Sequence, residues 1–64
     1  MSWRIVDTDN LGGDYPDEKF LLWPMPEEDA KDIARILNHR AGPDARRCYK
    51  AEEDGYVLAP GFEP

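Results

Sequence analysis

The sequence predicts one α+β domain over residues 1–64, in which a small antiparallel sheet carries one helix on a face, in the order β-β-α-β-β. A chain of 64 residues allows one hydrophobic core. Its middle segment has apolar residues at helical spacing, and short segments rich in aromatic and β-branched residues lie on either side. Glycine and proline separate these segments, which places turns between the elements.

Two strands are expected before the helix. Residues 3–8 are rich in aromatic and β-branched side chains, and residues 19–23 are apolar on both faces of an extended chain. The second strand should therefore be central in the sheet or covered on both sides. The stretch 9–16 between them holds the pair Gly12-Gly13, which permits positive φ angles and indicates a turn.

The helix is expected to run from about Pro26 to Ala41. Pro26 fits the first turn of a helix, where its missing N–H costs nothing, and Gly42 followed by Pro43 is typical of a helix end. One stripe has the spacing to face the sheet. It consists of Ala30, Ile33, Ala34 and Leu37, widened by Ile36.

A hairpin is expected after the helix, formed by residues 47–53 and 56–59 about the turn Asp54-Gly55. In this register one apolar face would meet the helix, and a shift by one residue would place a glutamate there instead. That face carries Tyr49, Ala51, Tyr56 and Leu58. The tail from Pro60 is too rich in turn residues to continue a strand.

The chain is acidic, with 14 Asp and Glu against 8 Lys and Arg and a formal net charge of −6. Its bases concentrate between residues 31 and 50, so the excess acid falls on the loop between the first two strands and on the hairpin tip. Phosphate binding needs clustered bases, which argues against direct contact with nucleic acid or an anionic membrane. This charge favours a basic protein surface as partner, although acidic loops also keep a small domain soluble.

Catalytic and metal chemistry find little support. Cys48 is the single cysteine, which cannot form an internal disulfide and fits a cytoplasmic protein. Together with His39 it supplies too few ligands for structural zinc, and a Cys–His catalytic pair would have to form between a strand and a helix end. No signal peptide or membrane span is expected. We expect no enzymatic activity, no metal and no cofactor.

The acidic loop also approximates a calcium-binding loop. Asp7, Asp9, Gly12 and Glu18 fall at positions 1, 3, 6 and 12 of that pattern, but Leu11 replaces a ligand at position 5. The flanks predict a strand and a proline break instead of two helices. An acidic loop turned by glycine is the simpler interpretation, and calcium binding is kept as an alternative.

The aromatic residues outnumber what one helix can cover. The group consists of Trp3, Tyr15, Trp23 and Phe62. In one interpretation they fill the core, with Phe62 packing the C-terminal tail back onto the sheet. In the other they form an apolar contact ringed by carboxylates, which is the usual composition of a protein-binding patch, or they bury a homodimer face.

Three segments resemble small phage and prophage proteins, among them anti-CRISPR inhibitors of type I systems. They are residues 6–18, the helix from Ala30 to Asn38, and the ending 54–64. The resemblance implies a non-enzymatic inhibitor in the cytoplasm of an infected bacterial cell. Such an inhibitor binds the multisubunit CRISPR surveillance complex (Cascade) and blocks recognition of target DNA, in many cases as an acidic DNA mimic.

Carboxylates at alternate positions of an extended chain recur at intervals of about 6.6–6.8 Å and can satisfy bases meant for phosphates. The expected partner-binding residues are Asp7, Asp9, Asp14, Asp17 and Glu18 of the loop, followed by Glu52, Glu53 and Asp54 of the hairpin tip. The positively charged stretch 31–50 interrupts the acidity of the chain and argues against mimicry of DNA by the whole molecule. We expect the inhibitor to be a monomer or weak homodimer. The alternative is a small structural or adaptor protein that acts by homodimerisation or strand-edge pairing.

Overall fold

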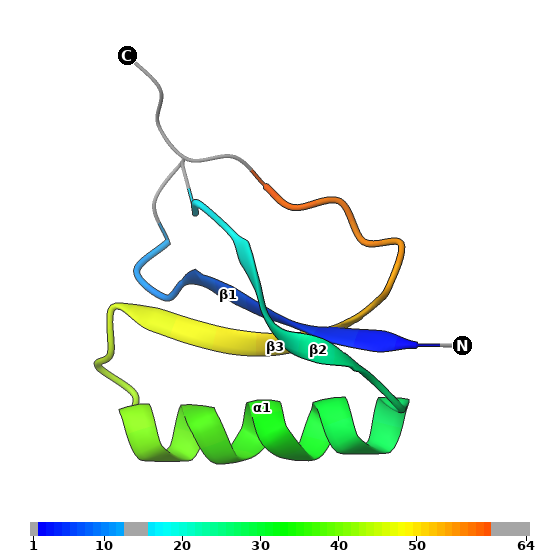
Figure 1. The fold of residues 1–64 in the computed structure, drawn as a ribbon. Coiled ribbons are helices and arrows are strands. Elements are labelled where there is room, and N and C mark those ends of the chain that lie inside the picture. Colours follow the sequence, from blue (N-terminus) through cyan, green and yellow to red (C-terminus); the bar gives the residue numbers. More distant parts are fainter. Residues whose placement is uncertain (1, 13–15, 60–64) are drawn as a thin grey trace.

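The computed structural model describes residues 2–12 and 16–59, which form an α+β fold of three strands and one helix (Figure 1). The elements follow in the order β1 (Trp3–Asp9), β2 (Lys19–Met25), α1 (Glu27–Ala41) and β3 (Arg47–Glu53). The single helix of this part of the chain is too short and too polar to cross a membrane.

The sheet is antiparallel, with the strand order β2-β1-β3. β1 is the central strand, and both Ile5 and Val6 on its two faces are fully buried. The expectation that residues 19–23 form a central or doubly covered strand is therefore wrong, because β2 lies at an edge. The apolar side chains of β2 that suggested burial on both faces include Leu22 and Trp23, which are exposed.

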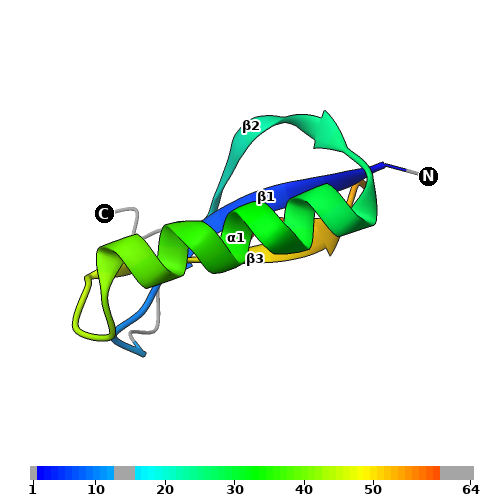
Figure 2. The same cartoon turned by 90° about the horizontal axis from the view of Figure 1, so that it is seen from below.

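The helix is confirmed, with Pro26 at the N-cap position and Gly42 at the C-cap with a φ of 87°. It packs on β3 and β1 (Figure 2). Ile5, Met25 and Ala30 form the buried centre of this layer. The partly buried side chains around it are Trp3, Leu21, Ile33, Leu37, Tyr49 and Ala51. Ile36 does not widen the stripe as expected, since it is 47% exposed.

β2 departs from a regular strand through a bulge. Trp3 pairs with Met25 and Ile5 pairs with Leu21, so β2 has two residues more than β1 between these pairs. Leu22 takes up the excess with a φ of 66°, an unusual conformation for a bulky residue. Pro24, which cannot donate a backbone hydrogen bond, lies in the same segment and is tolerated because the strand is at an edge.

The fourth strand of the predicted hairpin is absent, and residues 56–59 run without regular structure. The turn at Asp54-Gly55 does form, and the N–H of Tyr56 donates to the carbonyl of Glu53 at 2.9 Å. The chain then returns along the sheet, away from the helix, to Glu18 (Figure 1). Tyr56 contacts Glu18 and Lys50 there, so the expectation that it faces the helix is wrong.

Candidate protein-binding surface

Glu18 is a buried carboxylate on the sheet face opposite the helix, with a relative exposure of 8%. Its Oε2 accepts a hydrogen bond from Thr8 at 2.8 Å and pairs with the Nζ of Lys50 at 3.0 Å. Its Oε1 accepts from the hydroxyl of Tyr56 at 2.7 Å and from the N–H of Ala59 at 2.9 Å. Four donors from three segments therefore converge on one side chain, and they hold residues 56–59 on the sheet.

The contacts of Glu18 change its acidity. Burial by itself would raise the pKa of this carboxyl. The hydrogen bonds from Ala59, Tyr56, Thr8 and Lys50 favour the charged form and outweigh burial, so the pKa is lowered from 4.5 to about 2. The hydrogen bond to Tyr56 is the main cause that raises the pKa of Lys50, and Glu18 adds to it. The pair is therefore charged at neutral pH.

Arg47 holds the loop between β1 and β2 in place, as Glu18 holds residues 56–59. Its Nε donates to the carboxylate of Asp7 at 2.7 Å. Its two terminal nitrogens donate to the carbonyls of Pro16, Asp7 and Asp17 at 2.9, 3.2 and 2.7 Å. The hydrogen bond to Asp7 is the main cause that raises the pKa of Arg47. This planar, multi-donor contact fixes the loop end at residues 16 and 17.

Arg47→Lys should lower the free energy of unfolding by about 2 kcal/mol, because one ammonium cannot reach the carboxylate and three carbonyls that the guanidinium serves. Urea denaturation followed by circular dichroism measures this change. Arg46→Lys is the matched control, since Arg46 is exposed, and it should stay within about 0.5 kcal/mol of the unchanged protein. Equal stability of the two variants would show that the contacts of Arg47 do not secure the loop.

These contacts limit what two of the predicted partner-binding residues can offer to a partner. Glu18 is buried, so its carboxylate does not face a partner surface in this fold. Asp7 is about three-quarters buried against Arg47, so its charge is compensated within the molecule. A carboxylate that is paired in this way contributes little to the electrostatic field outside the protein.

The other predicted partner-binding residues differ in their contacts and exposure. Asp9 accepts the N–H of Leu11 at 3.1 Å, and Asp17 faces Lys19 at 3.7 Å. Glu52 is 3.6 Å from the Nζ of Lys50, and it is only 33% exposed. Asp14 lies outside the described residues. Two positions of the hairpin tip stay available to a partner, namely Glu53, which is exposed, and Asp54, whose carboxylate is 3.7 Å from Arg4.

The strand register gathers acidic residues at one end of the molecule. Trp3 pairs with both Met25 and Glu53, so the end of β3 and the start of α1 lie at the same end (Figure 1). We call this region the acidic end; its carboxylates are Glu27, Glu28, Asp29, Glu53 and Asp54. Lys31 pairs with Glu27 at 2.9 Å and Arg4 with Asp54. Glu28, Asp29 and Glu53 have no ion pair within the described part of the chain.

Sequence reasoning did not place the first turn of the helix in the site. Acidic residues at a helix start complement the helix dipole, which explains them without a partner. The signal that could have found them is topological. In a β-β-α-β order with short connections, the residues after the second strand and those at the end of the third meet at one end of the sheet.

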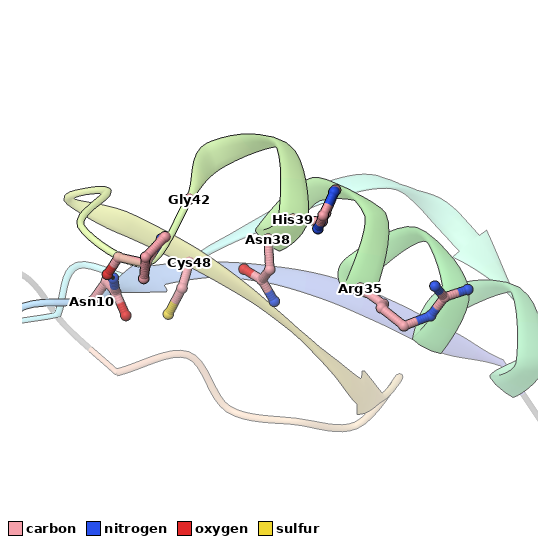
Figure 3. A pocket seen from close by; sticks show the side chains of 7 residues that line it. Asn10, Arg35, Asn38, His39, Gly42 and Cys48 are labelled. Carbon is pink, nitrogen blue, oxygen red and sulfur yellow. Dashed lines mark hydrogen bonds between the residues drawn. The ribbon is translucent and has the colours of Figure 1, made fainter.

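An open hollow of about 520 Å³ lies between the end of α1 and β3 (Figure 3). Its polar groups already serve the fold. The amide of Asn38 bonds the carbonyl and N–H of Tyr49 at 2.7 and 2.8 Å, and Asn10 donates to the carbonyls of Pro43 and Ala45. The ring of His39 points away from Cys48, so they do not form a pair (Figure 3). Within residues 2–12 and 16–59, no three metal-ligating side chains of the His, Cys, Asp and Glu types lie together.

Both edges of the sheet carry obstacles to pairing with another strand. On β3, the side chain of Asn38 occupies the outward N–H and C=O of Tyr49, in the manner of a neighbouring strand. On β2, the bulge at Leu22 and the proline at position 24 interrupt the row of backbone donors. Such features are typical of sheet edges that stay unpaired. They weigh against strand-edge pairing as the mode of action.

Comparison with protein-family models, curated proteins and solved structures finds no match to this chain. Its surface must therefore be interpreted from its own geometry.

Proposed function

We propose that this chain is a non-enzymatic inhibitor that uses its acidic end to bind a basic protein surface, and that this surface belongs to a type I CRISPR surveillance complex. The observation that supports the binding mode is the gathering of Glu28, Asp29 and Glu53 at one end without compensating bases. The resemblance to small phage proteins supports the identity of the partner.

The physical basis is competition for a DNA-binding groove. Such a groove holds clustered lysines and arginines that gain free energy by neutralising phosphates. Carboxylates on a rigid scaffold can meet the same bases and pay little conformational entropy on binding. The opposite end of the molecule carries Arg40 and Arg46, so the whole molecule is not a DNA mimic in charge. The mimicry proposed here is confined to the acidic end.

Neutralising the acidic end should weaken binding strongly. The triple variant Glu28→Gln, Asp29→Asn, Glu53→Gln removes the three uncompensated charges with little change in shape. We expect its affinity for a purified type I surveillance complex to fall at least tenfold, because each exposed charge pair contributes up to about 1 kcal/mol at low salt. Calorimetry gives the affinity, and target-DNA binding by the complex in its presence gives the inhibition.

The matched control removes three exposed carboxylates elsewhere, in the variant Asp17→Asn, Asp32→Asn, Asp44→Asn. It has the same net charge as the first variant and should keep nearly full affinity. Thermal denaturation verifies that both variants fold, since loss of acids from the first helical turn costs some stability. Equal loss in both variants would contradict a localised site, and absence of binding by the unchanged protein would refute the proposal.

A further inference from the structure

Trp23 is the large exposed aromatic side chain of the described residues, with 67% of its surface accessible. Three other aromatic rings of the described residues have a cation over them. Arg4 lies 4.2 Å from the centre of the Phe20 ring, Lys31 lies 5.4 Å from that of Trp3, and Lys50 covers Tyr56. Within residues 2–12 and 16–59, no cation covers Trp23. Its face is therefore open to a cation from another molecule.

The backbone holds Trp23 in place. It lies between Leu22, whose φ of 66° belongs to the bulge, and Pro24, whose ring restricts φ. A bulky residue at positive φ is strained, so the packed strand ends on either side must impose this conformation. An indole presented on a constrained segment loses little freedom on binding. Tryptophan in such a setting is a frequent energetic anchor of protein interfaces.

The bulge lies at the acidic end of the molecule. Trp23 is two residues before Met25, which pairs with Trp3, and Trp3 also pairs with Glu53 at the end of β3. Leu22, next to Trp23 in the chain, is 44% exposed. We call Leu22 and Trp23 the bulge surface.

We propose that the bulge surface binds an arginine of the basic partner, with the guanidinium stacked on Trp23 at the acidic end. This inference rests on the proposed function and names the side chain recognised. An arginine plane stacks on indole and also pairs with carboxylate, whereas a lysine ammonium is more strongly hydrated and makes a weaker contact. A second copy of this chain fits less well, because symmetric pairing would bring the carboxylates of two acidic ends together.

Two peptides of equal length and charge test the inference, one with arginine and one with lysine at every basic position. The unchanged protein should bind the arginine peptide about tenfold more tightly by calorimetry at low salt. Trp23→Ala should remove this preference. Leu11→Ala is the matched control, since Leu11 is 65% exposed and lies in the loop after β1, and it should keep the preference.

The outcomes separate the inference from the proposed function. If the unchanged protein and Trp23→Ala bind both peptides equally, while the triple acidic-end variant binds neither, Trp23 is not an arginine anchor and the acidic end still is a binding site. If the unchanged protein binds neither peptide, the arginine inference is overturned, and the surveillance-complex assay decides the proposed function separately. An equal loss of preference in Leu11→Ala and Trp23→Ala would also overturn the inference.

Discussion

Glu18→Ala is expected to lower the free energy of unfolding by about 3 kcal/mol. The substitution leaves the hydroxyl of Tyr56 and the ammonium of Lys50 without their acceptor. Loss of one member of a fully buried ion pair costs about 3–5 kcal/mol, and the effect here is at the lower end because the side chain of Lys50 is 36% exposed. A domain of this size has a total stability of roughly 3–10 kcal/mol. The variant should therefore be largely unfolded in chemical denaturation at urea concentrations that the unchanged protein withstands.

Glu18→Gln and Glu53→Ala serve as controls for this result. Glutamine keeps the shape and one acceptor oxygen, so it should lose about half as much stability. Glu53 is exposed, and its replacement should change stability by no more than about 0.5 kcal/mol. Amide exchange at Ala59 gives a local readout, because its N–H donates to Glu18. Protection of that amide in Glu18→Ala equal to that in the unchanged protein would contradict the role of the Glu18 side chain in holding residues 56–59.

Acid should destabilise the protein through the same side chain. The folded pKa of Glu18 is about 2, below its ordinary value of 4.5, so the unfolded chain binds its proton more readily. The stabilisation is complete above about pH 4.5 and is lost as the pH falls from there to about 2. A shift of this size corresponds to about 3 kcal/mol. Urea midpoints measured at a series of pH values across this window give the change directly.

Glu18→Gln is also the matched control for the acid experiment. It retains every other carboxylate of the chain, so any remaining acid dependence in this variant comes from those groups. The unchanged protein should lose about 3 kcal/mol more than the variant between pH 4.5 and 2. Parallel curves for the two proteins would show that Glu18 titrates normally in the fold and would contradict the lowered pKa.

Local patterns in the sequence predicted the positions of the helix and of the three observed strands along the chain well. Pro26, the acidic first turn and Gly42 are short-range signals that act within the helix itself, and the structure has the helix from Glu27 to Ala41. The prediction of a fourth strand is wrong for a physical reason. Residues 56–59 have strand-like composition, but the carboxylate of Glu18 accepts hydrogen bonds from the N–H of Ala59 and the hydroxyl of Tyr56 across the sheet. A long-range polar contact of this kind leaves no periodic trace in a sequence.

For the candidate site, too, the sequence predicted some features and only the structure decided others. The excess of acid and the supply of aromatic residues were visible in composition, and the tip residues Glu53 and Asp54 lie at the acidic end. Which carboxylates face outward was not visible. Arg47 lies 40 residues from Asp7 in the chain, and Lys50 lies 32 residues from Glu18, so their pairing depends on the strand register. Trp23 belongs to the aromatic group for which the sequence left both core and contact surface open, and the structure has it exposed at the bulge in β2.

The order of residues alone determined an acidic chain with an α+β fold, the bounds of its helix and the places where the chain turns. These follow from backbone preferences and from apolar spacing, which act over a few residues. Packing of distant segments decided that β1 is central, that Glu18 is buried, and that the start of α1 meets the end of β3. Charge acts on a partner only where it is solvent-exposed and unpaired, and that depends on contacts between residues far apart in the chain.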